Sequence, residues 1–267
     1  MFFKSHIIMK KLAFLFIALV TILSISACRI EKTDVSNEPA KSYTLNLRDF
    51  QSIKNYTGCD IHFTQSNTYK VVLKATPSWY ASHTITSNNG ELVLVQKEER
   101  KKKGITVLHI NAYDDDAELW ISAPSLAAVS IAGSGDFYAD SNITGKGLEM
   151  SIAGSGDCKL KNVTLTGDFY YIIAGSGDIE TGTIQARNAS FSISGSGDIE
   201  SKLAKVKTTE LTIAGSGDGT LAFDHCGYAN ISISGSGDVS LSGTLQSLDK
   251  SVSRAGDIDT DRLTLGK

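Results

Sequence analysis

A short phrase ending in Gly-Ser-Gly-Asp returns at nearly constant spacing through the second half of the chain. It reads Ser-Ile-Ala-Gly-Ser-Gly-Asp at 130–136 and 151–157, and a decayed copy, Ser-Val-Ser-Arg-Ala-Gly-Asp, stands at 251–257. A fixed period of this size predicts a solenoid, in which each repeat buries its apolar face only against its neighbours. The closing aspartates are 19–21 residues apart: Asp136, Asp157, Asp178, Asp198, Asp218, Asp238 and Asp257.

Aligning the copies on the aspartate gives columns of one residue type. Five positions earlier stand six isoleucines and Val252, and two positions before those the residues are apolar until Lys250. The residue between these two columns is mostly Ser or Thr, as in a strand with one buried face, and a second short strand follows the aspartate. The period is too short for a βαβ unit, which needs about 30 residues. We therefore expect an all-β fold, a parallel β-helix whose coils stack about 4.8 Å apart. Right-handed crossovers dominate parallel sheets and favour a right-handed coil.

The corner between the two strands is the predicted structural site. Glycine suits positions of positive φ and close backbone approach, and aspartate can accept hydrogen bonds from nearby amides. Stacked carboxylates would repel by roughly 1 kcal/mol per neighbouring pair even in water. Backbone amides, the corner serines, splaying into solvent or bound cations must offset this repulsion. A cation-binding repeat is the minority interpretation, because calcium-binding β-rolls have a nonapeptide period, and we predict no metal and no cofactor. The corner residues are Gly133, Gly135, Asp136, Gly154, Gly156, Asp157, Gly175, Gly177, Asp178, Gly195, Gly197, Asp198, Gly215, Gly217, Asp218, Gly235, Gly237 and Asp238.

The N-terminus has the features of an export signal. Lys10 and Lys11 precede an apolar run over 12–25, which is short for a membrane span of about 20 residues. The following Ser26-Ala27-Cys28 resembles a bacterial lipoprotein cleavage box, and the alternative is an ordinary secretory signal. We predict a signal peptide over 1–27, a lipidated Cys28 as membrane anchor, and a flexible tether to residue 42. Removal of 1–27, with three lysines and no acids, changes the net charge from −3 to −6, which gives no support for nucleic-acid binding.

Residues 43–125 lack the phrase but keep β character. Expected strands lie at 43–47, 59–65, 70–75, 91–96, 105–112 and 118–122, and no window shows convincing helical periodicity. This irregular β-rich portion either continues the solenoid as less regular coils or forms a small antiparallel sheet that caps it, because an exposed edge would pair with other chains. The repeat region then covers 126–267, and its polar last copy is typical of a terminal repeat.

Few residues outside the corners indicate chemistry. Gly-Ser-Gly-Asp is not the nucleophile motif Gly-x-Ser-x-Gly, and the charged runs 97–103 and 114–116 are typical of polar loops. The aromatic residues Trp79, Tyr80 and Trp120 could stack on sugars, although packing in the core or the cap is the commoner fate of strand aromatics. Cysteines and histidines show no metal-ligand spacing, and Cys158 lies in an inward column: Cys59, Cys158, Cys226, His62, His83, His109 and His225.

The repeated Ile-x-Gly-Ser-Gly-Asp resembles the "putative auto-transporter adhesin, head GIN domain" family, found mostly in lipoproteins of Bacteroidetes. The resemblance covers about residues 47–258. It includes Phe50 and Ile53, the stretches 60–63 and 91–94, and the sequence Ala-Pro-Ser-Leu at 123–126 that leads into the first repeat. It implies a β-helix-like fold and a place in the cell envelope. Arg254 and Ala255 depart from the pattern in the last corner.

Two classes of function follow. The first, which we favour, is a non-enzymatic, lipid-anchored protein of the cell envelope, expected at the outer membrane, whose stacked face binds glycan, protein or matrix. The second is a polysaccharide lyase or glycoside hydrolase, because such enzymes also use parallel β-helices, and fold alone cannot choose between them. The short period leaves no room for long groove-forming loops between 130 and 257. The sequence leaves open the ligand, the membrane face and the oligomeric state.

Overall fold

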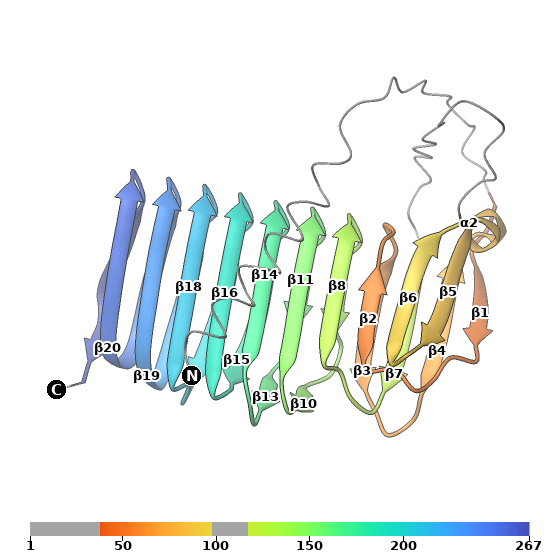
Figure 1. The fold of residues 1–267 in the computed structure, drawn as a ribbon, viewed down its shortest axis with the longest axis horizontal. Coiled ribbons are helices and arrows are strands. Elements are labelled where there is room, and N and C mark those ends of the chain that lie inside the picture. The colour runs from red at the N-terminus through yellow and green to blue at the C-terminus, as the bar shows by residue number, and fades with distance from the viewer. Residues whose placement is uncertain (1–37, 98–116, 267) are drawn as a thin grey trace, which may run out of the picture. The chain divides into compact units, whose positions relative to one another are not determined.

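The computed structural model describes residues 38–97 and 117–266. Within these ranges the chain is almost entirely β-strand, with one short helix (Figure 1). The predicted all-β solenoid is confirmed, because successive copies of the phrase lie in successive coils, paired in parallel and in register. Ile131 lies opposite Ile152, which lies opposite Ile173, and the same register continues to Ile233 and Val252.

The strands before the corners form one long parallel face. They are β2 (Ser52–Asn55), β8 (Ala128–Gly133), β11 (Leu148–Gly154), β14 (Phe169–Gly175), β16 (Asn188–Gly195), β18 (Thr208–Gly215) and the second halves of β19 (Gly219–Gly235) and β20 (Asp238–Arg254).

The strands after the corners form a second face. They are β3 (Asp60–Gln65), β9 (Phe137–Ala139), β12 (Cys158–Leu160), β15 (Ile179–Gln185), β17 (Ile199–Ala204), the first halves of β19 and β20, and β21 (Asp257–Leu265). A short third run is formed by β10 (Ile143–Gly145), β13 (Val163–Leu165) and the end of β15, which pair in parallel on the way back to the first face.

The core fills the interior of the coils. The inward columns predicted from the sequence are buried up to the sixth copy, and Phe137, Tyr171 and Phe191 among them are 0–1% exposed, whereas Val252 in the last copy is 42% exposed. Each inward residue packs on the same column of the next coil, so apolar area is buried along the whole length of the solenoid. Most of the alternating outward residues are polar or small, which is the pattern expected for a sheet with one wet face.

The first coil begins before the recognisable repeats. Strands β2 and β3 form this coil, and β8 and β9 of the next coil lie directly beside them. On the outer side of β2 lie β6 (Glu91–Gln96), parallel, and then β5 (His83–Asn88), antiparallel. On the outer side of β3 lie β7 (Glu118–Ala123), parallel, then β4 (Lys70–Ala75) and β1 (Lys41–Leu45), both antiparallel. Both expected arrangements are therefore present: β6 and β7 continue the parallel pairing outside the first coil, and β5, β4 and β1 add antiparallel strands beyond them.

One helix, α2 (Pro77–Ser82), was not expected from the sequence. Its six residues are too few to show a period, but Thr76 caps it by accepting a hydrogen bond from the Trp79 amide at 3.2 Å, and proline occupies its first turn. Strands β2 and β5 were also missed, because one has only four residues and the other, His-Thr-Ile-Thr-Ser-Asn, is polar. The expected strand 105–112 lies outside the described residues. No helix in the described ranges is long and apolar enough to span a membrane.

The C-terminal end of the solenoid has open edges. Within residues 38–97 and 117–266, the second half of β20 is paired on one side only, with β19, and β21 is paired on one side only, with β20. Lys250 stands in a column that is apolar in every earlier copy, and its ammonium donates to the Ile258 carbonyl at 3.4 Å. Lys250 is exposed at this register position, and charge at an edge is a recognised obstacle to pairing with another chain.

Candidate functional site

The predicted glycines lie where neighbouring coils approach most closely. A Cβ atom added at any of the twelve would be 1.7–2.8 Å from a carbonyl oxygen of the preceding coil or turn, well inside van der Waals contact. Gly154, Gly175, Gly195 and Gly215 also have φ between 142° and 150°, a region that other residues rarely adopt. The glycines therefore allow the coils to stack at strand spacing.

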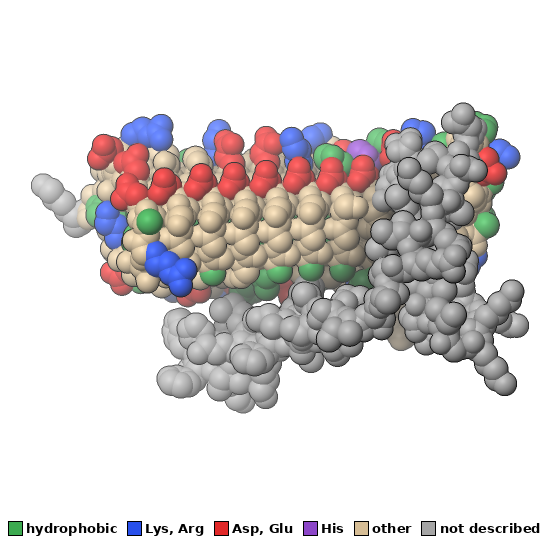
Figure 2. All heavy atoms as spheres, turned by 90° about the horizontal axis from the view of Figure 1, so that it is seen from above, with side chains coloured by type: hydrophobic (Ala, Val, Ile, Leu, Met, Phe, Trp, Pro, Cys, Tyr) green, Lys and Arg blue, Asp and Glu red, His purple; other side chains and the backbone are tan. Residues whose placement is uncertain are grey.

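The predicted aspartates form a continuous hydrogen-bonded ladder. In each coil the aspartate backbone N–H donates to Oδ1 of the aspartate one coil earlier, at 2.7–2.9 Å, from Asp136 to Asp257. Figure 2 shows the carboxylates as an unbroken row along the corners. Backbone amides are thus the groups that offset the carboxylate repulsion in the described structure. Among the described residues, no group of three or more His, Cys, Asp or Glu side chains could hold a metal ion.

The ladder has an eighth member that the repeated phrase did not reveal. Oδ1 of Asp60, in the first coil, accepts the Asp136 amide at 2.9 Å, so the stretch 55–60 occupies a corner without the Gly-Ser-Gly sequence. Asn55 is fully buried there and holds the bend through hydrogen bonds to the Cys59 carbonyl and the Thr57 amide and hydroxyl. Partial burial raises the pKa of Asp60, although the amide bond opposes that rise.

The predicted thiols and the decayed corner are structural in the described chain. Cys59, Cys158 and Cys226 are all buried without forming a disulfide, and burial raises the pKa of both Cys158 and Cys226, so these two are not reactive thiolates at neutral pH. The last corner keeps its ladder bond, although Arg254 adopts a φ of 91° at the position of a glycine. Cys28 and His109 lie outside the described residues.

A second group of residues on the outward side of the second face was only partly visible in the sequence. The register places Val72 (β4), Trp120 (β7), His62 (β3) and Tyr138 (β9) side by side across four strands. The imidazole of His62 stacks on the Trp120 indole, with ring centroids 4.0 Å apart and planes 7° apart, and on the Tyr138 ring at 4.9 Å and 16°. We call Trp120, His62 and Tyr138 the aromatic row.

Hydrogen bonds to acidic residues fix both ends of the aromatic row. The indole Nε1 of Trp120 donates to Glu118 Oε2 at 3.1 Å, and the Tyr138 hydroxyl donates to Asp136 Oδ2 at 2.7 Å. Partial burial alone would raise the pKa of Glu118, but hydrogen bonds from Trp120 and Lys74 outweigh it and lower the pKa. The bond to Asp136 raises the pKa of Tyr138. Glu118 therefore stays ionised at neutral pH and holds the Trp120 indole as a hydrogen-bond acceptor.

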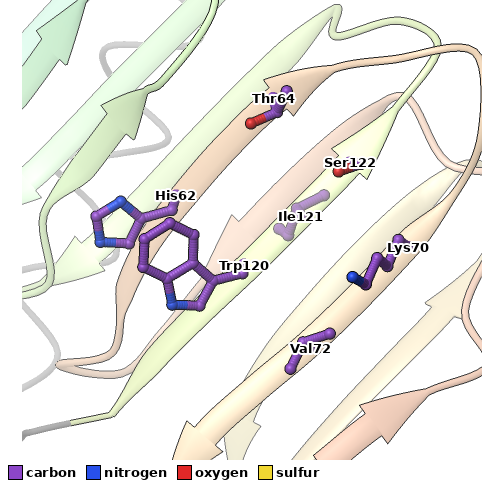
Figure 3. A pocket seen from close by; sticks show the side chains of 7 residues that line it. All are labelled: His62, Thr64, Lys70, Val72, Trp120, Ile121 and Ser122. Carbon is purple, nitrogen blue, oxygen red and sulfur yellow. The ribbon is translucent and has the colours of Figure 1, made fainter.

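The aromatic row borders a shallow depression of about 310 Å³. Figure 3 shows the ring faces of His62 and Trp120 turned toward the viewer, with Val72 and Lys70 across the depression from β4. Trp120 is 43% exposed, whereas Trp79 is 2% exposed, so only the latter follows the usual fate of strand aromatics. Apart from the buried Ile121, the remaining lining groups are polar: Thr64 and Ser122.

Sequence reasoning named Trp120 but could not assemble the row. His62 and Trp120 are 58 residues apart, and β7 enters the sheet between β3 and β4, an order that no local pattern indicates. The only available signal was aromatic or histidine residues at outward positions of two alternating strands. Tyr80 belongs to a different pair and stacks on Tyr43, with ring centroids 4.1 Å apart.

Comparison with known protein families gives a match over most of the chain. The model of the family described as "Putative auto-transporter adhesin, head GIN domain" matches residues 49–224 and 201–267. The chain belongs to this family. No curated protein matches it.

Several solved structures share the fold of this family member. A putative adhesin from Bacteroides fragilis NCTC 9343 has a TM-score of 0.68 at 18% identity, covering 84% of this chain and 97% of that chain. Two proteins from Parabacteroides distasonis ATCC 8503 cover the same shares: a putative adhesin (TM-score 0.57, 18% identity) and a putative lipid binding protein (TM-score 0.58, 23% identity). At these identities the likeness shows the fold alone.

Proposed function

We propose that this protein is a non-enzymatic binding module of the bacterial cell envelope and that it binds glycans through the aromatic row. The observation that carries the proposal is an indole 43% exposed at the edge of a depression, held by a ring stack and a hydrogen bond. A sugar ring has an apolar face that packs on an aromatic ring and hydroxyls that seek polar neighbours. Thr64, Ser122 and Lys70 supply such neighbours beside the indole.

The rigidity of the row supports binding without a change of shape. Three rings that stack across neighbouring strands lose little freedom when a ligand arrives, so less of the interaction energy is spent on ordering. The rings also project from parallel strands of the solenoid rather than from loops, which gives the most precise positioning.

Anchoring through Cys28 is part of the same proposal. Lipidation at this residue after removal of 1–27 would hold the binding module at the outer membrane, which agrees with a family described as adhesins and with relatives from Bacteroides and Parabacteroides. Replacement of Cys28 by serine would then move the full chain from the membrane fraction to the soluble envelope fraction. Retention in the membrane fraction would show that another segment anchors the chain.

The test of glycan binding compares the full chain with two Trp120 variants on a glycan array. We expect Trp120→Ala to lose at least about tenfold in affinity, because it removes the stacking surface, and Trp120→Phe to keep part of it. Unchanged binding in Trp120→Ala, with an unchanged unfolding midpoint, would contradict the proposal. Release of new reducing ends from a bound polysaccharide would instead support the alternative, a β-helix lyase or glycoside hydrolase. Binding of the same three proteins to lipid vesicles is measured in parallel, because one structural relative is described as a putative lipid binding protein.

A further inference from the structure

The depression beside Trp120 has charged residues on two sides, and the charges on the two sides are paired differently. Positions on neighbouring strands place three rows of outward side chains side by side: Lys74 and Glu118 on one flank, Val72 and Trp120 in the middle, Lys70 and Ser122 on the other. On the first flank the charges are already paired, because Lys74 Nζ lies 3.2 Å from Glu118 Oε1. The two flanks therefore differ in what they can offer a ligand.

On the second flank the positive charge has no acidic neighbour in the register. Lys70 lies opposite Ser122, with Val72 next on its own outward face, and among the described residues that line the depression it is the one with a permanent positive charge. Lys70 is exposed, and no ion pair joins it to another described residue. A cation without a counter-ion beside an apolar platform is suited to a ligand that carries its own anion.

The spacing of the two groups fits a single acidic sugar residue. Lys70 and Val72 are two residues apart on one strand, which places their Cα atoms about 6.6–6.8 Å apart on the same face. A pyranose ring on the indole and Val72 would therefore bring a carboxylate on its C5 atom to the Lys70 ammonium and the Ser122 hydroxyl. Thr64, on the neighbouring strand, would face the remaining hydroxyls.

We propose that the depression selects uronic-acid residues, with Trp120 stacking on the ring and Lys70 binding the carboxylate. This inference rests on the proposed glycan binding and narrows it to one chemical class. Lys70 is a specificity determinant in this scheme, while the aromatic row supplies affinity for neutral and acidic sugars alike. Because the ion pair would form near the surface, its contribution falls as salt concentration rises.

The experiment uses each of two polysaccharides in two chemical states. Polygalacturonate and alginate are each offered to the full chain before and after chemical reduction of their carboxyl groups to hydroxymethyl groups, and affinity is measured by calorimetry. Wild type is expected to bind the uronate form about 3- to 10-fold more tightly than the reduced form, because Lys70 is exposed and solvent screens the ion pair. Lys70→Met abolishes the preference, so that this variant binds the uronate and reduced forms with similar affinity. The matched control, Lys207→Met, removes an equal charge from an exposed position far along the solenoid, and keeps the preference.

Each other outcome overturns the inference in a recognisable way. Equal binding of both forms by wild type, or a preference that survives in Lys70→Met, removes the role of Lys70 but leaves the Trp120-dependent binding of neutral sugars standing. Equal losses in Lys70→Met and Lys207→Met would show attraction by net charge without a site. Binding of neither form, together with a Trp120-independent glycan array, overturns the inference and the proposed function together.

Discussion

Replacement of Gly175 by alanine examines the stacking of coils directly. Its φ is 150°, and an added Cβ would lie 1.9 Å from the Gly154 carbonyl oxygen of the coil below. Because real Cβ contacts essentially never fall under 3.0 Å, the two coils must separate by more than 1 Å at this point. That oxygen accepts the Ser176 amide at 3.0 Å, and the nearby ladder bond from the Asp178 amide to Asp157 is 2.9 Å long.

These contacts give the magnitude. A backbone conformation reserved for glycine costs about 1–3 kcal/mol, and each of the two hydrogen bonds contributes about 1 kcal/mol, so Gly175→Ala should lower the free energy of unfolding by about 3–5 kcal/mol. Gly90→Ala is the matched control. Its φ is 80° but no atom lies within 4 Å of the added Cβ, so only the conformational cost of about 1–2 kcal/mol remains.

The measurement is urea unfolding of each variant, followed by circular dichroism. The comparison holds if both variants keep the wild-type slope, so that the midpoints report stability. Similar midpoints for Gly175→Ala and Gly90→Ala would refute the argument, because they would show that close approach of the coils does not require glycine.

Three further predictions concern the ladder, an ion pair 3.0 Å long between Asp168 and Arg187 of neighbouring coils, and the open end. Asp178→Ala leaves the Asp198 amide without its acceptor and should lower the free energy of unfolding in urea by about 1 kcal/mol. Asp178→Asn keeps an acceptor oxygen and should lower it less. Equal losses of stability in the two variants would contradict the role of the side-chain oxygen. The Arg187 guanidinium lowers the pKa of Asp168 in the folded protein, so Arg187→Met should reduce the free energy of unfolding at pH values above the unfolded pKa of about 3.9. The difference in stability from wild type should disappear as pH falls through the lowered pKa. A difference that persists in acid would contradict this explanation. The double variant Lys250→Ile, Arg254→Gly should self-associate with rising concentration in light scattering, because it restores the apolar column and the glycine corner at an open edge, and a strictly monomeric variant would contradict this.

The repeated part of the fold could be predicted because one period repeats a single physical solution. The same isoleucine and glycine contacts recur in each coil, so the spacing of the phrase alone is enough to predict the register between neighbouring coils. The first coil could not be found in this way. Asp60 occupies the ladder position, but Asn55 stands opposite Ile131 in the isoleucine column, and Thr57 and Cys59 lie where the next copy has Gly133 and Gly135.

The candidate site was less predictable than the fold. Trp120 was visible as an aromatic residue in a strand, but its exposure depends on which strands flank β7, and those strands come from distant parts of the sequence. The pairing of Lys74 with Glu118, which leaves Lys70 on the other flank, follows from an antiparallel register that no single-strand pattern specifies. The sequence pattern therefore did not indicate which distant strands lie next to one another in the sheet, and the site depends on that order.

The aspartate ladder gives every interior corner the same pair of hydrogen bonds. Each corner donates one amide to the coil before it and offers one oxygen to the coil after it, so excision or duplication of a whole period joins two compatible surfaces. Gene duplication could thus lengthen or shorten such a molecule in steps of about 4.8 Å without redesign of either terminus. The number of coils would then set the distance from the aromatic row to the C-terminal end of the solenoid. This distance would change in evolution without any change in the residues that bind the ligand.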